Sequence, residues 1–147
     1  MGVVGSNASQ LNTPFGIFIN QQRTVYIADS NNHRIMKWFS GAAVGIVVAG
    51  NGTSGYSSTQ LNRPTQVIVD NNEYMYISEA DNSRITRWGP NSTFGVCIAG
   101  CTGSRGTAAN QLYSPHSLTF DRYGSLYVSD RNNHRVQKFQ ILSYNSK

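Results

Sequence analysis

The segment "ADSNNHRIMKW" at residues 28–38 decides the fold, because the chain states it three times. The segment "SDRNNHRVQKF" at residues 129–139 is nearly identical, and "SEADNSRITRW" at residues 78–88 is a looser copy. A segment that returns at a regular interval is typical of repeat architectures, in which each copy builds one supersecondary unit. The question is then which residues serve the unit and which are free for function.

The interval is set by a second motif that precedes each copy. "QLNTP", "QLNRP" and "QLYSP" begin at Gln10, Gln60 and Gln111, so the periods are 50 and 51 residues. Each proline starts an apolar run, which is followed by a turn, by a run that ends in an acid, and by the repeated segment. The first two units add "GIVVAG" or "GVCIAG". These runs are about five residues long and rich in β-branched and aromatic residues, which predicts four strands per unit, named a to d.

Four short strands per repeat of this length predict the blades of a β-propeller. We predict an all-β propeller segment of three four-stranded blades over residues 1–147, with repeats at approximately 10–59, 60–110 and 111–147. The last unit lacks strand d, and residues 1–9 match the glycine-rich loop that follows a strand d. Strand a is apolar at almost every position, which predicts that both of its faces are buried.

The repeated residues resemble a known family. The order of proline, apolar strand, aspartate, "LYVSD", "NHRVQKF" and "AG" followed by a further glycine is similar to the NHL repeat, in three copies that cover essentially the whole chain. The resemblance implies a six-bladed propeller, of which this chain supplies about half. An open arc exposes apolar faces on both terminal blades, so we expect either a homodimer that closes a six-bladed ring or further blades from a longer chain.

Every copy carries an acid at the end of strand b, an asparagine in the turn, and an arginine at the start of strand c. These residues are Asp29, Asn32 and Arg34, then Glu79, Asn82 and Arg84, then Asp130, Asn133 and Arg135. We predict that the acid accepts N–H bonds from the turn and pairs with the arginine, and that the asparagine supplies a left-handed residue or a side-chain cap. A group present in every blade serves the blade, so we assign these residues a structural role.

The histidine of the repeated segment is also assigned a structural position in the turn. His33 and His134 share their position with Ser83, so the turn does not need an imidazole. The recurrent aromatic residues are predicted to pack between blades, with stacking on bases as the alternative. They are Tyr26, Tyr76, Tyr127, Trp38, Trp88 and Phe139.

Residues that differ between copies are the better candidates for function. After the three prolines stand Phe15, Thr65 and His116, which are predicted to approach the propeller axis. His116, in "SPHSL", resembles a zinc-ligand position of amidating-lyase propellers, which use three converging histidines. One imidazole does not make a zinc site, so we predict no metal, no other cofactor and no catalytic residue, with His116 as a weak candidate ligand.

A second enzyme resemblance concerns the acids that follow strand a. Lactonase-type propellers hold an axial calcium ion with Glu, Asn and Asp side chains. Asn20, Asp70 and Asp121 follow strand a here, but their surroundings predict that they start the a–b turn.

The charge balance bears on partners. The net charge is +5, from 12 basic and 7 acidic residues, with no basic run. Arg63, Arg105 and Arg131 fall in loops and are candidate contacts for RNA or an acidic partner. We favour a non-catalytic NHL-repeat scaffold that binds another macromolecule, protein in the first place, through propeller loops. A single-stranded RNA-binding surface is the alternative, and a fragment of a propeller enzyme of amidating-lyase or lactonase type is the second alternative.

The sequence leaves the compartment unknown. No apolar stretch approaches the roughly 20 residues of a membrane-spanning helix. Cys97 and Cys101 either form a disulfide across a glycine-containing turn or remain separate thiols. The start "MGVVGS" fits a myristoylation pattern with Gly2 as the acceptor, and also fits an ordinary N-terminus.

Overall fold

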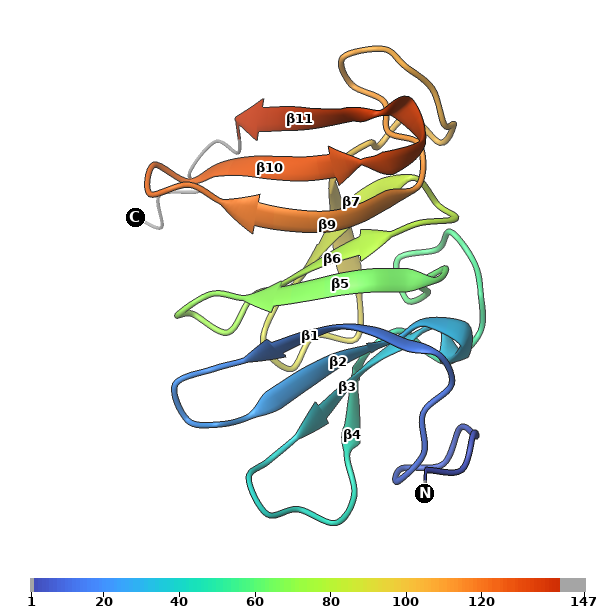
Figure 1. Cartoon of the computed structure of the whole chain (residues 1–147), viewed down its shortest axis with the longest axis vertical. Helices are drawn as coiled ribbons and strands as arrows, with labels where there is room; N and C mark the ends of the chain where they lie inside the picture. Colours follow the sequence, from blue (N-terminus) through green and yellow to red (C-terminus); the bar gives the residue numbers. More distant parts are fainter. Residues whose placement is uncertain (1, 141–147) are drawn as a thin grey trace.

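A computed structural model describes residues 2–140, and these form an all-β arc of three sheets (Figure 1). Blade 1 contains β1 (Pro14–Ile19), β2 (Val25–Asp29), β3 (Arg34–Trp38) and β4 (Ile46–Ala49). Blade 2 contains β5 (Pro64–Val69), β6 (Met75–Glu79), β7 (Arg84–Trp88) and β8 (Gly95–Ala99). Blade 3 contains β9 (Pro115–Phe120), β10 (Ser125–Asp130) and β11 (Arg135–Gln140). The prediction of two four-stranded blades and one blade without strand d is confirmed for the residues that the structure describes.

Each sheet is an antiparallel meander whose strands follow chain order. The b–c connection contains a short 3₁₀ turn in two blades, η1 (Ser30–Asn32) and η2 (Arg131–Asn133). In Figure 1 the b–c turns lie at the end of the blades where strand a begins, and the a–b turns lie at the other end. We call these the b–c end and the a–b end.

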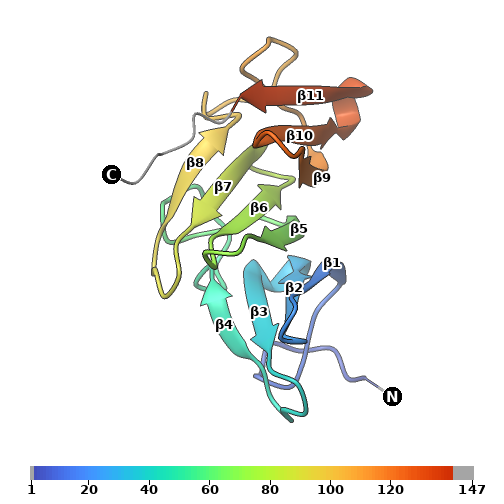
Figure 2. The same cartoon turned by 90° about the vertical axis from the view of Figure 1, so that its left-hand side faces the viewer.

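The blades stack face to face, with the inner strands β1, β5 and β9 side by side (Figure 2). One apolar core lies between blades 1 and 2, and a second lies between blades 2 and 3. Ile35 of blade 1 and Val67 and Ile77 of blade 2 are fully buried in the first core, and Ile85 and Leu118 fill the second. Each blade thus completes its neighbour's core, which is why the sequence must repeat.

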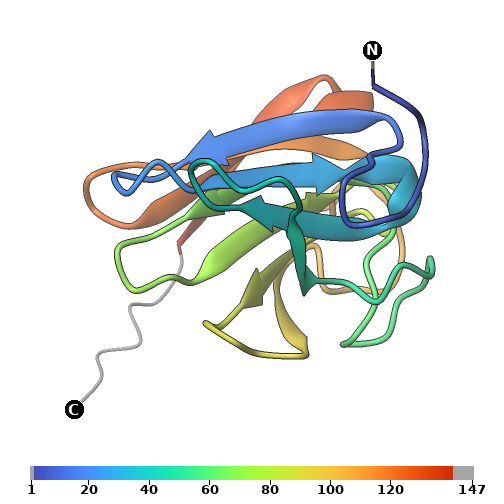
Figure 3. The ribbon, with the colours of Figure 1, turned by 90° about the horizontal axis from the view of Figure 1, so that it is seen from below.

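The prediction that strand a is buried on both faces holds only where a blade lies on each side. In blade 2, which is flanked on both sides, Val67 of β5 is fully buried in the core toward blade 1, and Ile68 is partly buried against the core toward blade 3. In blade 1, Ile17 and Ile19 of β1 are 58% and 57% exposed, so the prediction is wrong for this strand. Figure 3 shows the outer face of blade 1 turned toward the viewer, with no described strand in front of it.

The segment before β1 repeats the loop that follows a strand d. Val4 forms an isolated bridge with Leu11, as Ser54 does with Leu61 in the loop between blades 1 and 2. The alignment of residues 1–9 with that loop therefore holds for the part that the structure describes. No helix within residues 2–140 is long and apolar enough to cross a membrane.

Candidate binding surface at the b–c end of the blades

The repeated acid, asparagine and arginine form one hydrogen-bonded cluster in each blade, whose acid is buried in all three blades and whose arginine is buried in blades 1 and 2. In blade 1, Asp29 is fully buried and accepts hydrogen bonds from Arg34 Nε at 2.7 Å and from Asn32 Nδ2 at 2.8 Å. The remaining arginine nitrogens donate to backbone carbonyls of the preceding loop, including Ser6 and Gln10. Glu79 with Arg84, and Asp130 with Arg135, repeat this arrangement. These ion pairs link the loop before strand a to the b–c turn.

Two details of the predicted cluster are different in the structure. The acid accepts its backbone N–H bond from Asn12, in the loop before strand a, and not from the b–c turn. The left-handed residue is not the asparagine but its successor, with φ of 51° at His33 and at Ser83 and 52° at His134. The asparagine acts as a side-chain cap, since Asn32 Nδ2 also donates to the carbonyl of Gly5. The acid therefore ties together segments far apart in sequence.

The left-handed residue of one blade links that blade to the next. His33 Nδ1 accepts the backbone N–H of Arg63 at 3.2 Å, and Ser83 Oγ accepts that of Ser114 at 3.3 Å. His33 and Ser83 therefore both accept a backbone hydrogen bond from the next blade, one through an imidazole nitrogen and the other through a hydroxyl oxygen. We call this hydrogen bond the inter-blade latch.

The latch predicts an acid-sensitive stability. Burial, with help from Arg63, lowers the pKa of His33 from 6.5, while Asp81 opposes the shift. A histidine with a lowered folded pKa binds protons more readily when unfolded, so its stabilising effect is complete above pH 6.5 and is lost as the pH falls through the lower folded value. A protonated Nδ1 also cannot accept the latch bond.

His33→Ser supplies the acceptor that blade 2 already uses. We expect this variant to match the wild type at pH 7 and to lose less stability at pH 5, whereas His33→Ala loses about 1 kcal/mol at pH 7. Urea denaturation at both pH values measures this. A His33→Ser protein with the full acid dependence of the wild type would contradict the assignment.

The starts of the inner strands converge at the b–c end. The rings of Phe15 and His116 meet edge to face with centroids 5.4 Å apart, although they belong to blades 1 and 3. Between them Thr65 is buried, and its hydroxyl donates to the carbonyl of Pro115 at 3.1 Å. Phe15 remains 55% exposed. The residues predicted to approach the axis therefore form a partly exposed aromatic pair.

The electrostatic surroundings of His116 are positive. Burial lowers the pKa of His116, and the charges of Arg131 and Arg63 lower it further. The imidazole is therefore neutral near pH 7, and it lies beside guanidinium groups that repel a metal cation. Within residues 2–140, no three His, Cys, Asp or Glu side chains gather as a metal-binding group.

The three candidate arginines all lie at the b–c end. Arg63 forms an exposed ion pair with Asp81 at 3.7 Å. The guanidinium of Arg105 lies 4.9 Å from the ring centroid of Tyr113, whose carbonyl accepts from the b–c turn of blade 3. Arg131 opens that same turn. The charges of Arg63 and Arg131 act on His116, whereas Arg105 contacts only Tyr113 among the described interactions. We name the five residues at this end the basic rim: Phe15, Arg63, Arg105, His116 and Arg131.

The residues after strand a cap turns at the opposite end. Asp70 Oδ1 accepts the backbone N–H groups of Asn72 and Tyr74 at 2.9 and 3.0 Å. Asp121 and Asn20 play the same part in blades 3 and 1. This agrees with the predicted turn role, and it places these oxygens away from His116.

Four of the six recurrent aromatic residues pack in the cores between blades, as predicted, whereas Trp38 and Tyr127 of the terminal blades belong to neither core and are partly buried. Tyr26 and Trp88 are 3% and 1% exposed in the first core. Tyr76 meets Phe120 edge to face in the second core, at a centroid distance of 4.7 Å.

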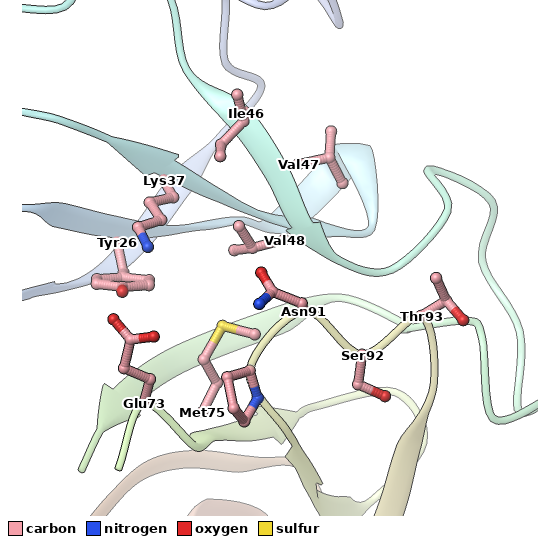
Figure 4. Close-up of a pocket in the computed structure, with 11 residues that line it drawn as sticks. Tyr26, Lys37, Ile46, Val47, Val48, Glu73, Met75, Asn91, Ser92 and Thr93 are labelled. Carbon is pink, nitrogen blue, oxygen red and sulfur yellow. The ribbon is translucent and has the colours of Figure 1, made fainter. Parts of the chain in front are cut away.

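Two features were missed or left open by the sequence. A cavity of about 240 Å³ lies between blades 1 and 2 at the a–b end (Figure 4). Its wall combines Lys37 and Val48 of blade 1 with Glu73 and Met75 of blade 2. No sequence signal marks it, because its sides come from strands of blade 1 and from strand and turn residues of blade 2 that are far apart in sequence. The structure also settles the cysteines, since Cys97 and Cys101 form a disulfide.

Comparisons with known proteins agree with this architecture. The family model of the NHL repeat matches residues 112–139. No curated protein sequence matches the chain. Residues 10–59 and 60–110 contain strands a to c in the same order as the matched segment, followed by a fourth strand.

Solved structures supply the rest of the comparison. An auxiliary nutrient-binding protein of Bacteroides ovatus is 21% identical, with a TM-score of 0.71 over 84% of this chain and 36% of that one. A gluconolactonase of Xanthomonas campestris is 19% identical, with a TM-score of 0.62 over 84% and 36%. A virginiamycin B lyase of Staphylococcus aureus is 12% identical, with a TM-score of 0.60 over 99% and 46%.

The chain spans between about a third and a half of the length of these structures. At this level of identity the likeness concerns the fold alone, and the fold carries binding proteins and enzymes alike. The chain therefore carries an NHL repeat at residues 112–139 within a partial β-propeller.

Proposed function

We propose that this chain is a non-catalytic scaffold that binds an acidic surface of a partner protein through the basic rim. The observation that carries the proposal is Phe15, an aromatic side chain that is 55% exposed and is held against His116 at the end of the inner strands. Aromatic residues and arginine are the residue types enriched at protein interfaces and at their energetic centres.

Rigidity and charge support the proposal. The acid and arginine clusters beneath the rim are buried and paired, so the rim is held by a stiff support that loses little entropy on binding. Arg105 and Arg131 have no carboxylate partner in the ion pairs of residues 2–140, and the chain carries a net charge of +5. A positive rim around an aromatic anchor complements an acidic partner surface.

Single-stranded RNA is the second candidate, because a base can stack on an exposed ring and a phosphate can pair with arginine. The two candidates differ in their dependence on salt. If Arg63, Arg105 and Arg131 neutralise three phosphates, the logarithm of RNA affinity falls with the logarithm of salt concentration with a slope of about −2.

The test offers the protein two probes, a random 12-residue peptide display library and a fluorescent 12-nucleotide polyuridine. We expect enrichment of acidic peptides, lost in Phe15→Ala and in Arg131→Glu. The matched controls are Phe94→Ala, which removes an equally exposed ring, and Arg122→Glu, which reverses a charge in an a–b turn. If the protein binds RNA with a salt dependence of that slope and enriches no peptide, the protein-binding proposal is wrong and RNA binding takes its place.

The enzyme hypothesis has its own readout in the same preparation. A metal-dependent lyase or lactonase requires stoichiometric zinc or calcium, which elemental analysis of the purified protein measures. Metal at one equivalent per chain, lost in His116→Ala, would contradict the scaffold proposal.

A further inference from the structure

The cavity between blades 1 and 2 carries charges of both signs. Figure 4 shows the ammonium group of Lys37, on β3, and the carboxylate of Glu73, in the a–b turn of blade 2, pointing into it beside the ring of Tyr26. Within residues 2–140 neither charged group makes a hydrogen bond or an ion pair, so the two are too far apart to pair with each other. A small ligand that enters the cavity therefore meets a cation and an anion together.

The equivalent lysine of blade 3 has a partner within its own blade. Lys138 Nζ lies 3.9 Å from Asp121 Oδ2, at the start of the a–b turn. Blade 1 has the neutral Asn20 at the position of Asp121, so no carboxylate of its own blade compensates the charge of Lys37. Lys37 lies over two aromatic rings instead, with Nζ 5.4 Å from the ring centroid of Tyr26. Its charge remains available to a ligand.

The acid distinguishes this cavity from the gap between blades 2 and 3. The left-handed position of the a–b turn is occupied by Arg23, Glu73 and Gly124, with φ of 61°, 64° and 81°. The turn therefore needs the left-handed backbone and not the carboxylate. Since blade 3 has glycine there, its side of the second gap carries no acid at this position. A side chain that differs between copies at a shared backbone position is free to serve binding.

A buried hydroxyl and an apolar wall complete the cavity. Tyr26 is 3% exposed, and its hydroxyl makes no hydrogen bond with any residue of the described range 2–140. Within that range no side-chain oxygen is both sealed from solvent and without a partner, so this hydroxyl is accessible from the cavity that its ring lines. Met75 and Val48 supply apolar surface beside it. The volume of about 240 Å³ is below the roughly 300–1,000 Å³ of drug-sized ligand pockets, which suits a smaller molecule.

We propose that this cavity binds a free α-amino acid with an aliphatic side chain. The carboxylate of the ligand pairs with Lys37 and accepts the hydroxyl of Tyr26, and its ammonium group pairs with Glu73. Its side chain lies against Met75 and Val48. An α-amino acid fits because its two opposite charges are attached to one carbon atom, which also carries the apolar group. Lys37 and Glu73 also line a wider hollow at the a–b end, which gives the ligand access.

This site lies at the opposite end of the blades from the basic rim, so it does not rest on the proposed protein binding. Calorimetric titration with L-leucine and two analogues tests the class of ligand. 4-Methylpentanoate lacks the amino group of leucine, and 3-methylbutylamine lacks its carboxylate, so each leaves one charge of the cavity unmatched. We expect saturable binding of one leucine per chain, and at least tenfold weaker binding of both analogues. An absence of leucine binding, or an analogue that binds as tightly as leucine, would overturn the proposal.

Variants of the protein test the two charges. Glu73→Gly removes the acid and keeps the turn, because blade 3 has Gly124 at this position. Lys37→Gln removes the cation. We expect each variant to bind leucine at least tenfold more weakly than the wild type. The matched control is Arg23→Gly, which changes the same turn position in blade 1, where the side chain does not line the cavity.

The control should bind leucine as the wild type does. If Arg23→Gly weakens binding as much as Glu73→Gly, the turn and not the carboxylate affects the ligand, and the proposal is wrong. Unchanged affinity in Glu73→Gly leads to the same conclusion, and it does so even if Lys37→Gln fails to fold.

Discussion

Arg84→Ala should lower the free energy of unfolding by about 3–5 kcal/mol, because it leaves a buried carboxylate without its cation. Glu79 is 0% exposed and accepts from Arg84 Nε at 2.9 Å, with further donors from Asn82 and Thr86. Arg84 also donates to the carbonyl of Tyr56 in the d–a loop. One substitution thus uncouples the hairpin from the loop that precedes it.

The loss should depend on pH in a defined direction. Burial raises the pKa of Glu79 above 4.5 even with Arg84 present, which opposes the shift. A carboxyl with a raised folded pKa favours folding when it is protonated, and this contribution is lost as the pH rises through the folded value. The deficit of Arg84→Ala should therefore shrink on acidification, and Glu79→Gln combined with Arg84→Ala should recover part of it at pH 7.

Arg63→Ala is the matched control, since it breaks an ion pair whose side chains are 51% and 43% exposed. Exposed pairs contribute about 0–1 kcal/mol, so we expect a small change. Urea denaturation followed by tryptophan fluorescence compares the two variants. Equal losses would show that the buried cluster has no special part in stability.

The fold was predictable because its determinants are local. The period, the proline at the start of strand a and the acid at the end of strand b fix strands and turns without reference to distant residues. Burial was not predictable in the same way. Strands β1 and β5 have similar apolar sequences, but Ile17 is exposed and Val67 is buried, since burial depends on whether a second blade lies alongside.

The site was predictable only in part, for the same reason. Because Phe15 and His116 follow the proline at equivalent positions, the sequence predicted that both approach the propeller axis, and in the structure their rings are in contact. The inter-blade latch was missed because His33 and Ser83 look unrelated in sequence. The sequence did contain a signal, because His33 and Ser83 occupy equivalent positions and their partners each stand directly before the proline that starts the next strand a. Only the structure shows that both side chains accept a hydrogen bond from that partner.

Trp88→Ala should lower the free energy of unfolding by about 3–5 kcal/mol, the range for removal of a large buried aromatic side chain. Trp88 is 1% exposed, donates from Nε1 to Thr86 at 3.2 Å, and belongs to the core between blades 1 and 2. Trp38→Ala removes the same residue at the same register position of blade 1, where the ring is only partly buried.

The two tryptophans share one contact and differ in another. Each ring is covered by a glycine at the start of strand d, Gly45 for Trp38 and Gly95 for Trp88, but only Trp88 lies in a core between two blades. The difference between the two losses therefore measures the inter-blade contact, and we expect Trp38→Ala to cost less than half as much. Circular dichroism in urea gives both values. Equal losses would mean that each blade is stabilised within itself, and that stacking contributes little to holding the three blades together.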